Sequence, residues 1–470
     1  MPVLWAPDPR GVVTLDPRRR MWLLLGFLGL ALFCLFFLVR PFLGTADAYR
    51  PRLIPGVTYA YGFLVVAALV PYAVAVWASR SGVPFWPAAL AGAALHLIVL
   101  FAPLTQSQDL YAYLFYGKMW AVHGANPYTV MPLAFASDPW FPWMQWRDVP
   151  SVYGPLWTML TGGVAKLAGS SLAVGFVLMK LILLGLGGAC VMGIRRASKA
   201  RSQDPGRNAV LAMWSPLVIV SLPLGGHADV AVVAAVLWAI VADRRERPLL
   251  AAVILTAASL IKLYAGIVLL VYLIALVRRH APSAVRAAGL AAGGTVLAWL
   301  PFWDGLSTLS ALAEIGERAS ASLGGQIQLA LAGPLDGGTA RLLVRLAGIA
   351  TIAAVVLILA RRPGFTKDPW PAAAAAFVAY IAVTPWFLYW HLTGPLALAL
   401  VAGSPAVRAA ALTFSGTSML TASFGGSAWG RVVQTCLRYG LPMAAGLRAA
   451  KPPETEGTRP RSRPPQRSSA

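Results

Sequence analysis

Charged residues are scarce in this chain of 470 residues. They make up 12% of it, whereas hydrophobic residues make up 58%, and the mean hydropathy is +0.68. Soluble domains usually carry about 25% charged residues, so this composition excludes an ordinary soluble protein. Apolar runs of membrane-spanning length recur along most of the chain. The sequence therefore predicts an all-α polytopic membrane protein.

Acidic residues are the scarcer of the two signs. There are 17 of them against 39 lysines and arginines, which gives a formal net charge of +22. Such an excess could indicate nucleic-acid binding, but the basic residues lie in short segments between apolar runs. That distribution is typical of cytoplasmic loops, which attract lysine and arginine. We expect contact with membrane lipid and no nucleic-acid partner.

Cysteine is also rare. The three cysteines, Cys34, Cys190 and Cys436, lie inside or beside apolar segments. Their spacing fits neither a disulfide framework nor a zinc site. The first apolar run follows three arginines at 18–20 and has no small-residue cleavage site, so we expect a first membrane helix with a cytoplasmic N-terminus.

The apolar runs predict three parts. Residues 1–20 form a cytoplasmic segment, 21–448 a membrane domain of roughly 13–14 crossings, and 449–470 a disordered, basic, proline-rich tail. Helices are expected near 21–43, 57–79, 86–104, 154–169, 171–194, 208–224, 229–242, 249–263, 264–278, 287–303, 339–360, 370–385, 391–408, 409–425 and 431–448.

Charge sets the predicted orientation. The basic segments 195–207, 278–286 and 361–368 should be cytoplasmic. The loops 105–150 and 304–338 are net negative and should face outward. These assignments agree only if one early helix fails to cross, and the short, glycine-containing run near 154–169 is the candidate for a re-entrant or surface-lying segment. Both termini are then cytoplasmic.

Five polar residues are expected on the outward side although they are far apart in sequence: Asp109, His227, Asp229, Lys262 and His391. Each has an ordinary interpretation alone, as a solvated loop carboxylate, a helix cap or a lysine that reaches to the membrane interface. Polar groups at membrane depth are costly, however, and five at one depth favour a shared outward-facing cavity.

Residues 109–123 predict an outward helix lying at the membrane surface. Asp109, Tyr113, Tyr116 and Trp120 are spaced by four, three and four residues, so they share one helix face. Gly124 suits the end of this helix. Aromatic rings of this kind suit both sugar binding and a membrane interface, and the spacing leaves both open.

Short motifs along the chain resemble those of a known superfamily. They are Asp109-Leu-Tyr-Ala-Tyr113, Gly124-Ala-Asn-Pro-Tyr128, Tyr153-Gly-Pro-Leu156, Gly226-His-Ala-Asp229, Lys262 and the aromatic turn at 386–391. In this order they resemble the GT-C membrane glycosyltransferases, and more narrowly the bacterial mannosyltransferases that use polyprenyl-phosphate-mannose. The likeness runs from about residue 20 to 445.

The resemblance implies an inverting transfer of a hexose, mannose in the narrower group, from a polyprenyl-phosphate donor to a glycolipid or glycan acceptor outside the cell membrane. Asp109 would be the catalytic base. In the superfamily this acid often follows the first membrane helix and sometimes has an acidic neighbour. Here it follows the third predicted helix and its neighbour is Gln108. A metal-binding acidic pair is therefore not implied, and Asp47, after the first helix, is a rival.

On this reading the donor phosphate would be bound by Lys262, His391 and His227, with Lys118 and Arg147 as outside candidates. The substrate-binding residues would be Asp229, Tyr113, Asn126, Tyr128, Tyr153, Gln108 and Trp386. We expect no cofactor and no metal. A ligase acting on lipid-linked glycans would differ only in its donor. A transporter or a flippase for lipid-linked sugars is the main alternative, although the internal repeats common in transporters are absent from the sequence.

Overall fold

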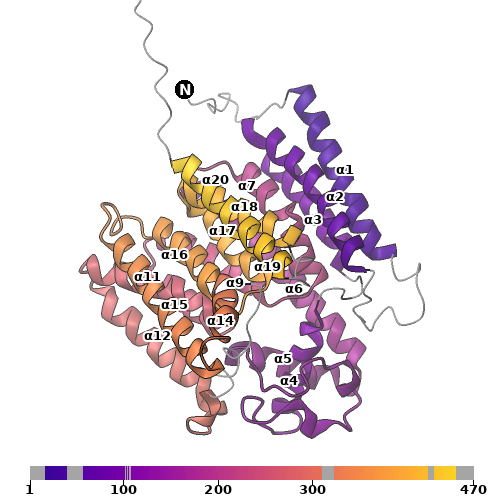
Figure 1. Ribbon diagram of the computed structural model, residues 1–470, viewed down its shortest axis with the longest axis vertical. Coiled ribbons are helices and arrows are strands. Elements are labelled where there is room, and N and C mark those ends of the chain that lie inside the picture. Colours follow the sequence, from indigo (N-terminus) through magenta and orange to yellow (C-terminus); the bar gives the residue numbers. More distant parts are fainter. Residues whose placement is uncertain are drawn as a thin grey trace, which may run out of the picture.

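The computed structural model describes residues 16–39, 57–100, 102, 104, 107–309, 322–421 and 428–450. Within these ranges the chain forms helices and turns, with one isolated bridge between Asp304 and Leu306 and no strand (Figure 1). The predicted all-α polytopic fold is confirmed. Asp47, most of the N-terminal segment and residues 451–470 of the predicted tail lie outside the described ranges.

Five helical stretches are long and apolar enough to cross a membrane: 17–38, 64–81, 172–200, 283–302 and 337–360. They belong to α1 (Pro17–Val39), α2 (Val57–Ala78), α6 (Leu172–Ala200), α12 (Ser283–Trp299) and α15 (Gly337–Ala360). A sixth span results if α7 (Pro205–Met213) and the following stretch, bent by 58°, count together. The other predicted crossings are shorter helices, so the number of 13–14 crossings stays a prediction.

The shorter helices fill the middle of the bundle and one side of it (Figure 1). They are α3 (Phe85–Leu100), α8 (Pro216–Ile219) with a π-helical turn η5 (Val220–Leu224), α9 (Asp229–Asp243), α10 (Pro248–Ser259), α11 (Gly266–Arg278), α14 (Leu323–Leu331), α16 (Trp370–Val383), α17 (Thr393–Ala402), α18 (Pro405–Leu420), α19 (Ala428–Thr435) and α20 (Leu441–Ala450). Helix α9 packs on α6, α10 and α17. It is apolar all round between its two terminal aspartates, as a central buried helix requires.

Residues 107–150, named the outward segment for the side of the membrane that their sequence predicts, begin with the predicted helix. Helix α4 (Asp109–Ala121) is followed by Gly124, whose φ of 65° lies in the left-handed region that glycine adopts readily. It packs on α5 (Pro155–Ala168) with the two backbones close together, because a Cβ on Gly117 would lie 2.4 Å from the Thr161 carbonyl carbon. Helices α4 and α5 thus pack closely together at one end of the molecule (Figure 1).

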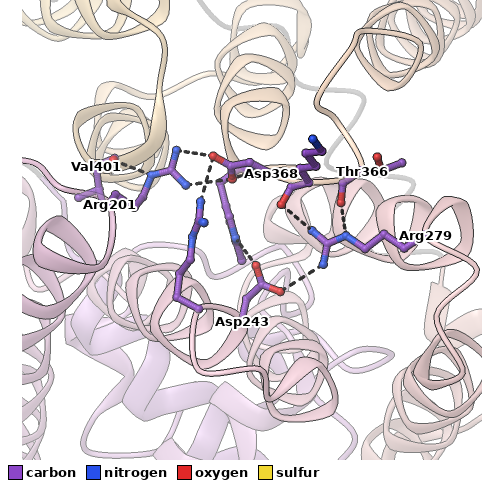
Figure 2. Close-up of polar contacts among 9 residues, drawn as sticks. Arg201, Asp243, Arg279, Thr366, Asp368 and Val401 are labelled. Carbon is purple, nitrogen blue, oxygen red and sulfur yellow. Dashed lines mark hydrogen bonds and ion pairs between the residues drawn. The ribbon is translucent and has the colours of Figure 1, made fainter.

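Near Asp243, the last residue of α9, a network of ion pairs joins several helix ends (Figure 2). Arg201 donates two hydrogen bonds, of 2.9 and 2.7 Å, to Asp368, and Arg244 lies 3.0 Å from the same carboxylate. Arg279 lies 3.6 Å from Asp243. The three basic segments predicted to share one side therefore meet at one end of the bundle. Which side of the cell membrane this end faces stays a prediction.

Candidate active site

A cavity of about 290 Å³ lies beside the start of α4. Five of the predicted catalytic and binding residues line it: Asp109, Tyr153, Lys262, Trp386 and His391. The rest of the wall comes from α4, α15, α16 and the segments that precede α5, α11 and α17. It includes Tyr116, Trp146, Val149, Val152, Leu263, Tyr264, Arg345, Tyr380, Ile381, Thr384, Pro385, Leu388 and Trp390. Residues separated by up to 282 positions in sequence, from Asp109 to His391, thus line one cavity.

Asp109 is the first residue of α4 and is only 4% exposed. One carboxylate oxygen accepts a hydrogen bond of 3.1 Å from Trp146 Nε1, and the other lies 3.3 Å from His227 Nδ1. Burial alone would raise the pKa of Asp109, but the nearby His227 ring, the charge of Lys262 and the Ser107 hydroxyl hold this pKa well below its usual range. The N-terminus of the helix favours the same charged form. Asp109 is therefore an ionised carboxylate.

His227 is placed by a glycine turn that follows η5. Gly226 has a φ of 70°, and a Cβ on it would lie 2.7 Å from Leu110 of α4. A Cβ on Gly225 would lie 2.8 Å from the His227 ring. These close approaches require glycine at both positions. The imidazole stacks on Trp390, with ring centroids 4.1 Å apart, so the turn holds a flat, fully buried ring against Asp109.

Lys262 forms an ion pair with Asp229, the residue at which α9 begins after this turn. Lys262 Nζ lies 3.0 Å from Asp229 Oδ2, and the Tyr264 hydroxyl donates to the other oxygen. Asp229 is fully buried at the start of α9, and Lys262 is 9% exposed. Lys262 therefore belongs to the cavity wall, and Asp229 lies behind the wall where it anchors Lys262 and Tyr264.

Residues 37–278, just over half of the chain, match the family described as alpha-(1->6)-mannopyranosyltransferase, N-terminal domain. The chain belongs to this family. Asp109, His227, Asp229 and Lys262 all lie inside the matched region, whereas the 384–391 segment lies beyond it.

Two family proteins show the likeness at the level of single chains. A probable alpha-(1->6)-mannopyranosyltransferase of Mycolicibacterium smegmatis is 30% identical over 137 residues, which are 27% of this chain and 24% of the relative. An alpha-(1->6)-mannopyranosyltransferase of Mycobacterium tuberculosis is 29% identical over 140 residues, 28% of this chain and 23% of the relative. The match thus spans about a quarter of these relatives. No solved structure matches the chain significantly.

Several predicted site residues of this family member lie outside the cavity wall. The Tyr113 hydroxyl accepts a 3.2 Å hydrogen bond from the Ala228 N–H, so it supports the turn that carries His227. The Asn126 side chain donates to the Phe302 carbonyl at 2.8 Å, and the Tyr128 hydroxyl donates to the Tyr153 carbonyl at 2.8 Å. Both residues hold the outward segment in place.

Three further candidates for the site, Gln108, Lys118 and Arg147, also lie outside the cavity wall. Gln108 is partly exposed beside Asp109 and does not line the cavity. Lys118 Nζ lies 2.8 Å from Asp138, with which it forms a buried pair. Arg147 donates to the Met144 carbonyl at 2.9 Å. The two outside candidates for the phosphate, Lys118 and Arg147, therefore bind parts of the outward segment itself.

Sequence reasoning missed three residues with clear placement. Arg345 of α15 and Trp146 line the cavity. Lys180 of α6 is fully buried, and its Nζ donates to the Pro223 carbonyl at 2.7 Å in the turn below His227. Lys180 and Arg345 could have been selected from the sequence, because a lysine or arginine inside an apolar run is by default a candidate functional residue.

The described residues contain no group of three or more histidine, cysteine, aspartate or glutamate side chains placed to hold a metal ion.

Proposed function

We propose that this protein transfers a hexose, mannose by its family, from a polyprenyl-phosphate donor to a glycolipid or glycan acceptor at the outer face of the cell membrane. The observation that supports this best is the content of the cavity wall. It holds one carboxylate, Asp109, together with Lys262, Arg345 and several aromatic rings. An acid to accept a proton and cations to receive a phosphate are what such a transfer needs.

Asp109 is proposed as the general base. The attacking hydroxyl of the acceptor loses its proton as the new bond to the anomeric carbon forms, and an ionised carboxylate can accept that proton. Among the described residues that line the cavity, Asp109 is the one carboxylate. Because the described lining residues include no second carboxylate that could act as a nucleophile, we propose a single displacement with inversion at the anomeric carbon.

The cations would stabilise the leaving lipid phosphate. This group is already a weak base, so its departure requires charge compensation and no proton donor. Lys262 and Arg345 supply positive charge on the wall, and His391 can donate a hydrogen bond. His227 lies behind Asp109 and contacts it at 3.3 Å, so its proposed role shifts from phosphate binding to orienting the base.

Aromatic residues would hold the sugar. Trp146, Trp386 and Trp390 line the same cavity as Asp109, and indole rings both stack on apolar sugar faces and donate a hydrogen bond. The Trp146 indole already donates to Asp109. A sugar stacked on this wall would therefore lie beside the base.

The test is covalent transfer by purified protein in detergent, with a radiolabelled polyprenyl-phosphate mannose and a mannoside acceptor. We expect a labelled product whose anomeric configuration, read by NMR, is opposite to that of the donor. A product that retains the configuration would contradict the single displacement. A transporter or flippase would give movement across vesicles and no covalent product in detergent, so this outcome would favour the alternative.

A further inference from the structure

A second cavity, of about 190 Å³, lies among helices that the first cavity does not touch. Its wall is formed by α3, α6, α9, α17 and the α7–η5 stretch. The two cavities share no lining residue. Residues 222–229, which are all buried, run between them and carry the His227 turn.

The wall of the second cavity is mostly apolar. Its polar side chains include His96, Thr393 and Cys190, and each is already bonded to the protein backbone. His96 Nε2 donates to the Met213 carbonyl at 2.8 Å. Thr393 donates to the Trp390 carbonyl at 2.9 Å, and Cys190 contacts a carbonyl at 3.5 Å. A hydrocarbon chain therefore fits this wall better than a polar headgroup does.

The mouth of the cavity opens at the lipid-facing surface. Leu97 of α3 and Leu184 of α6 line it and are 52% and 42% exposed. Exposed leucines on the helices of a polytopic membrane protein face the acyl chains of the bilayer. Lipid hydrocarbon is thus the material directly outside.

Glycines on α6 widen this mouth. Gly187 and Gly188 line the cavity, and a Cβ on either would meet no atom within 4 Å. Gly185 on the same helix also has open space around it but does not line the cavity. Helix α6 therefore leaves open space at Gly187 and Gly188, which a larger side chain would fill.

We propose that the second cavity binds one acyl chain of a bilayer phospholipid, inserted between α3 and α6. An apolar cavity of about 150 Å³ stays dry and binds benzene, so 190 Å³ of apolar space accommodates a chain segment. The proposed donor has its phosphate beside Lys262 in the first cavity, on the other side of residues 222–229. The occupant is therefore a separate lipid, and the inference depends on the membrane location and not on transferase activity.

Photolabelling tests this proposal without any activity measurement. The full chain is reconstituted in vesicles that contain a phosphatidylglycerol with a diazirine near the end of one acyl chain, irradiated, and the labelled residues are mapped by mass spectrometry. We expect label on inner lining residues such as Leu183 and Ile194. Gly187→Leu should lose this label, because its side chain extends into the cavity, while Gly185→Leu keeps it.

Gly188→Leu provides a second blocking variant, and melting temperatures show whether each variant is folded. Equal inner labelling in wild type and both folded blocking variants would overturn the proposal. Label confined to the exposed Leu97 and Leu184 would do the same. Loss of inner label on addition of excess polyprenyl phosphate would show that the occupant is a prenyl chain, which also contradicts the assignment.

Discussion

Replacing Asp109 with asparagine separates the proposed chemistry from the structure around it. Asparagine has the same shape and keeps an oxygen that can accept the 3.1 Å hydrogen bond from Trp146. It loses the charge that faces His227 at 3.3 Å and the ability to take a proton. The cavity wall should therefore persist while the base disappears.

The size of the effect follows from general-base catalysis, which contributes about 10²–10⁴-fold to the rate. At about 1.4 kcal/mol for each factor of ten, this corresponds to roughly 3–6 kcal/mol of transition-state stabilisation. Because the proton moves only in the transition state, kcat should fall by this factor while KM for the donor stays nearly unchanged.

The assay is radiolabelled transfer in detergent, run beside Asp148→Asn. Asp148 is an exposed carboxylate of the same outward segment and does not line the cavity, so its variant should keep wild-type turnover. Near-normal kcat in Asp109→Asn would refute the assignment of the base. Equal losses in both variants would trace the effect to general damage to the outward segment.

Three other predictions concern the supports of this site. Lys262→Met should raise the pKa of Asp109, because the charge of Lys262 helps to keep it low; the acid limb of kcat against pH then moves to higher pH, and an unmoved limb would mean that another group sets it. Lys180→Met should lower the free energy of unfolding by about 1–3 kcal/mol for each carbonyl left without a donor, and should lower kcat because His227 is then misplaced. Lys180→Arg should restore part of the stability and part of kcat. A wild-type melting temperature and wild-type kcat in Lys180→Met would contradict this prediction. Gly154→Ala would place a Cβ 2.0 Å from the Leu260 carbonyl oxygen, so we expect a loss of at least about 2 kcal/mol in unfolding free energy and a raised KM for the donor, and an unchanged melting curve would argue against the close contact.

Apolar patterning predicts most helices of this protein, because a membrane helix is a long uninterrupted signal. The helix that starts at Asp109 was predictable from its spacing and from Gly124. Boundaries between adjacent apolar helices were harder. The predicted break after residue 408 lies at 403–404, where Ser404 accepts a hydrogen bond from the Val407 N–H and Pro405 starts α18. This serine–proline signal was present but lay inside an apolar run.

The site was predictable to the extent that its residues are charges in apolar surroundings. Asp109, Lys262 and His391 do line one cavity. For Tyr113 and Tyr128 the sequence could not decide, because a tyrosine hydroxyl bonds equally well to a substrate or to a backbone carbonyl. Only the packing of distant segments shows which partner lies within reach. Helix α14 was missed for a related reason, because its glutamines resemble a polar loop.

Helix α9 has a consequence for how the chain tolerates change in length. It begins at Asp229, which holds Lys262, and ends at Asp243, which accepts hydrogen bonds from Tyr272 and Trp370 at 2.9 and 2.8 Å. A helix turns by about 100° and rises 1.5 Å with each residue. One inserted residue would thus swing one aspartate away from its partners, whichever end stayed in place. Between its two aspartates α9 should accept exchanges among apolar residues of similar size, but no insertion or deletion.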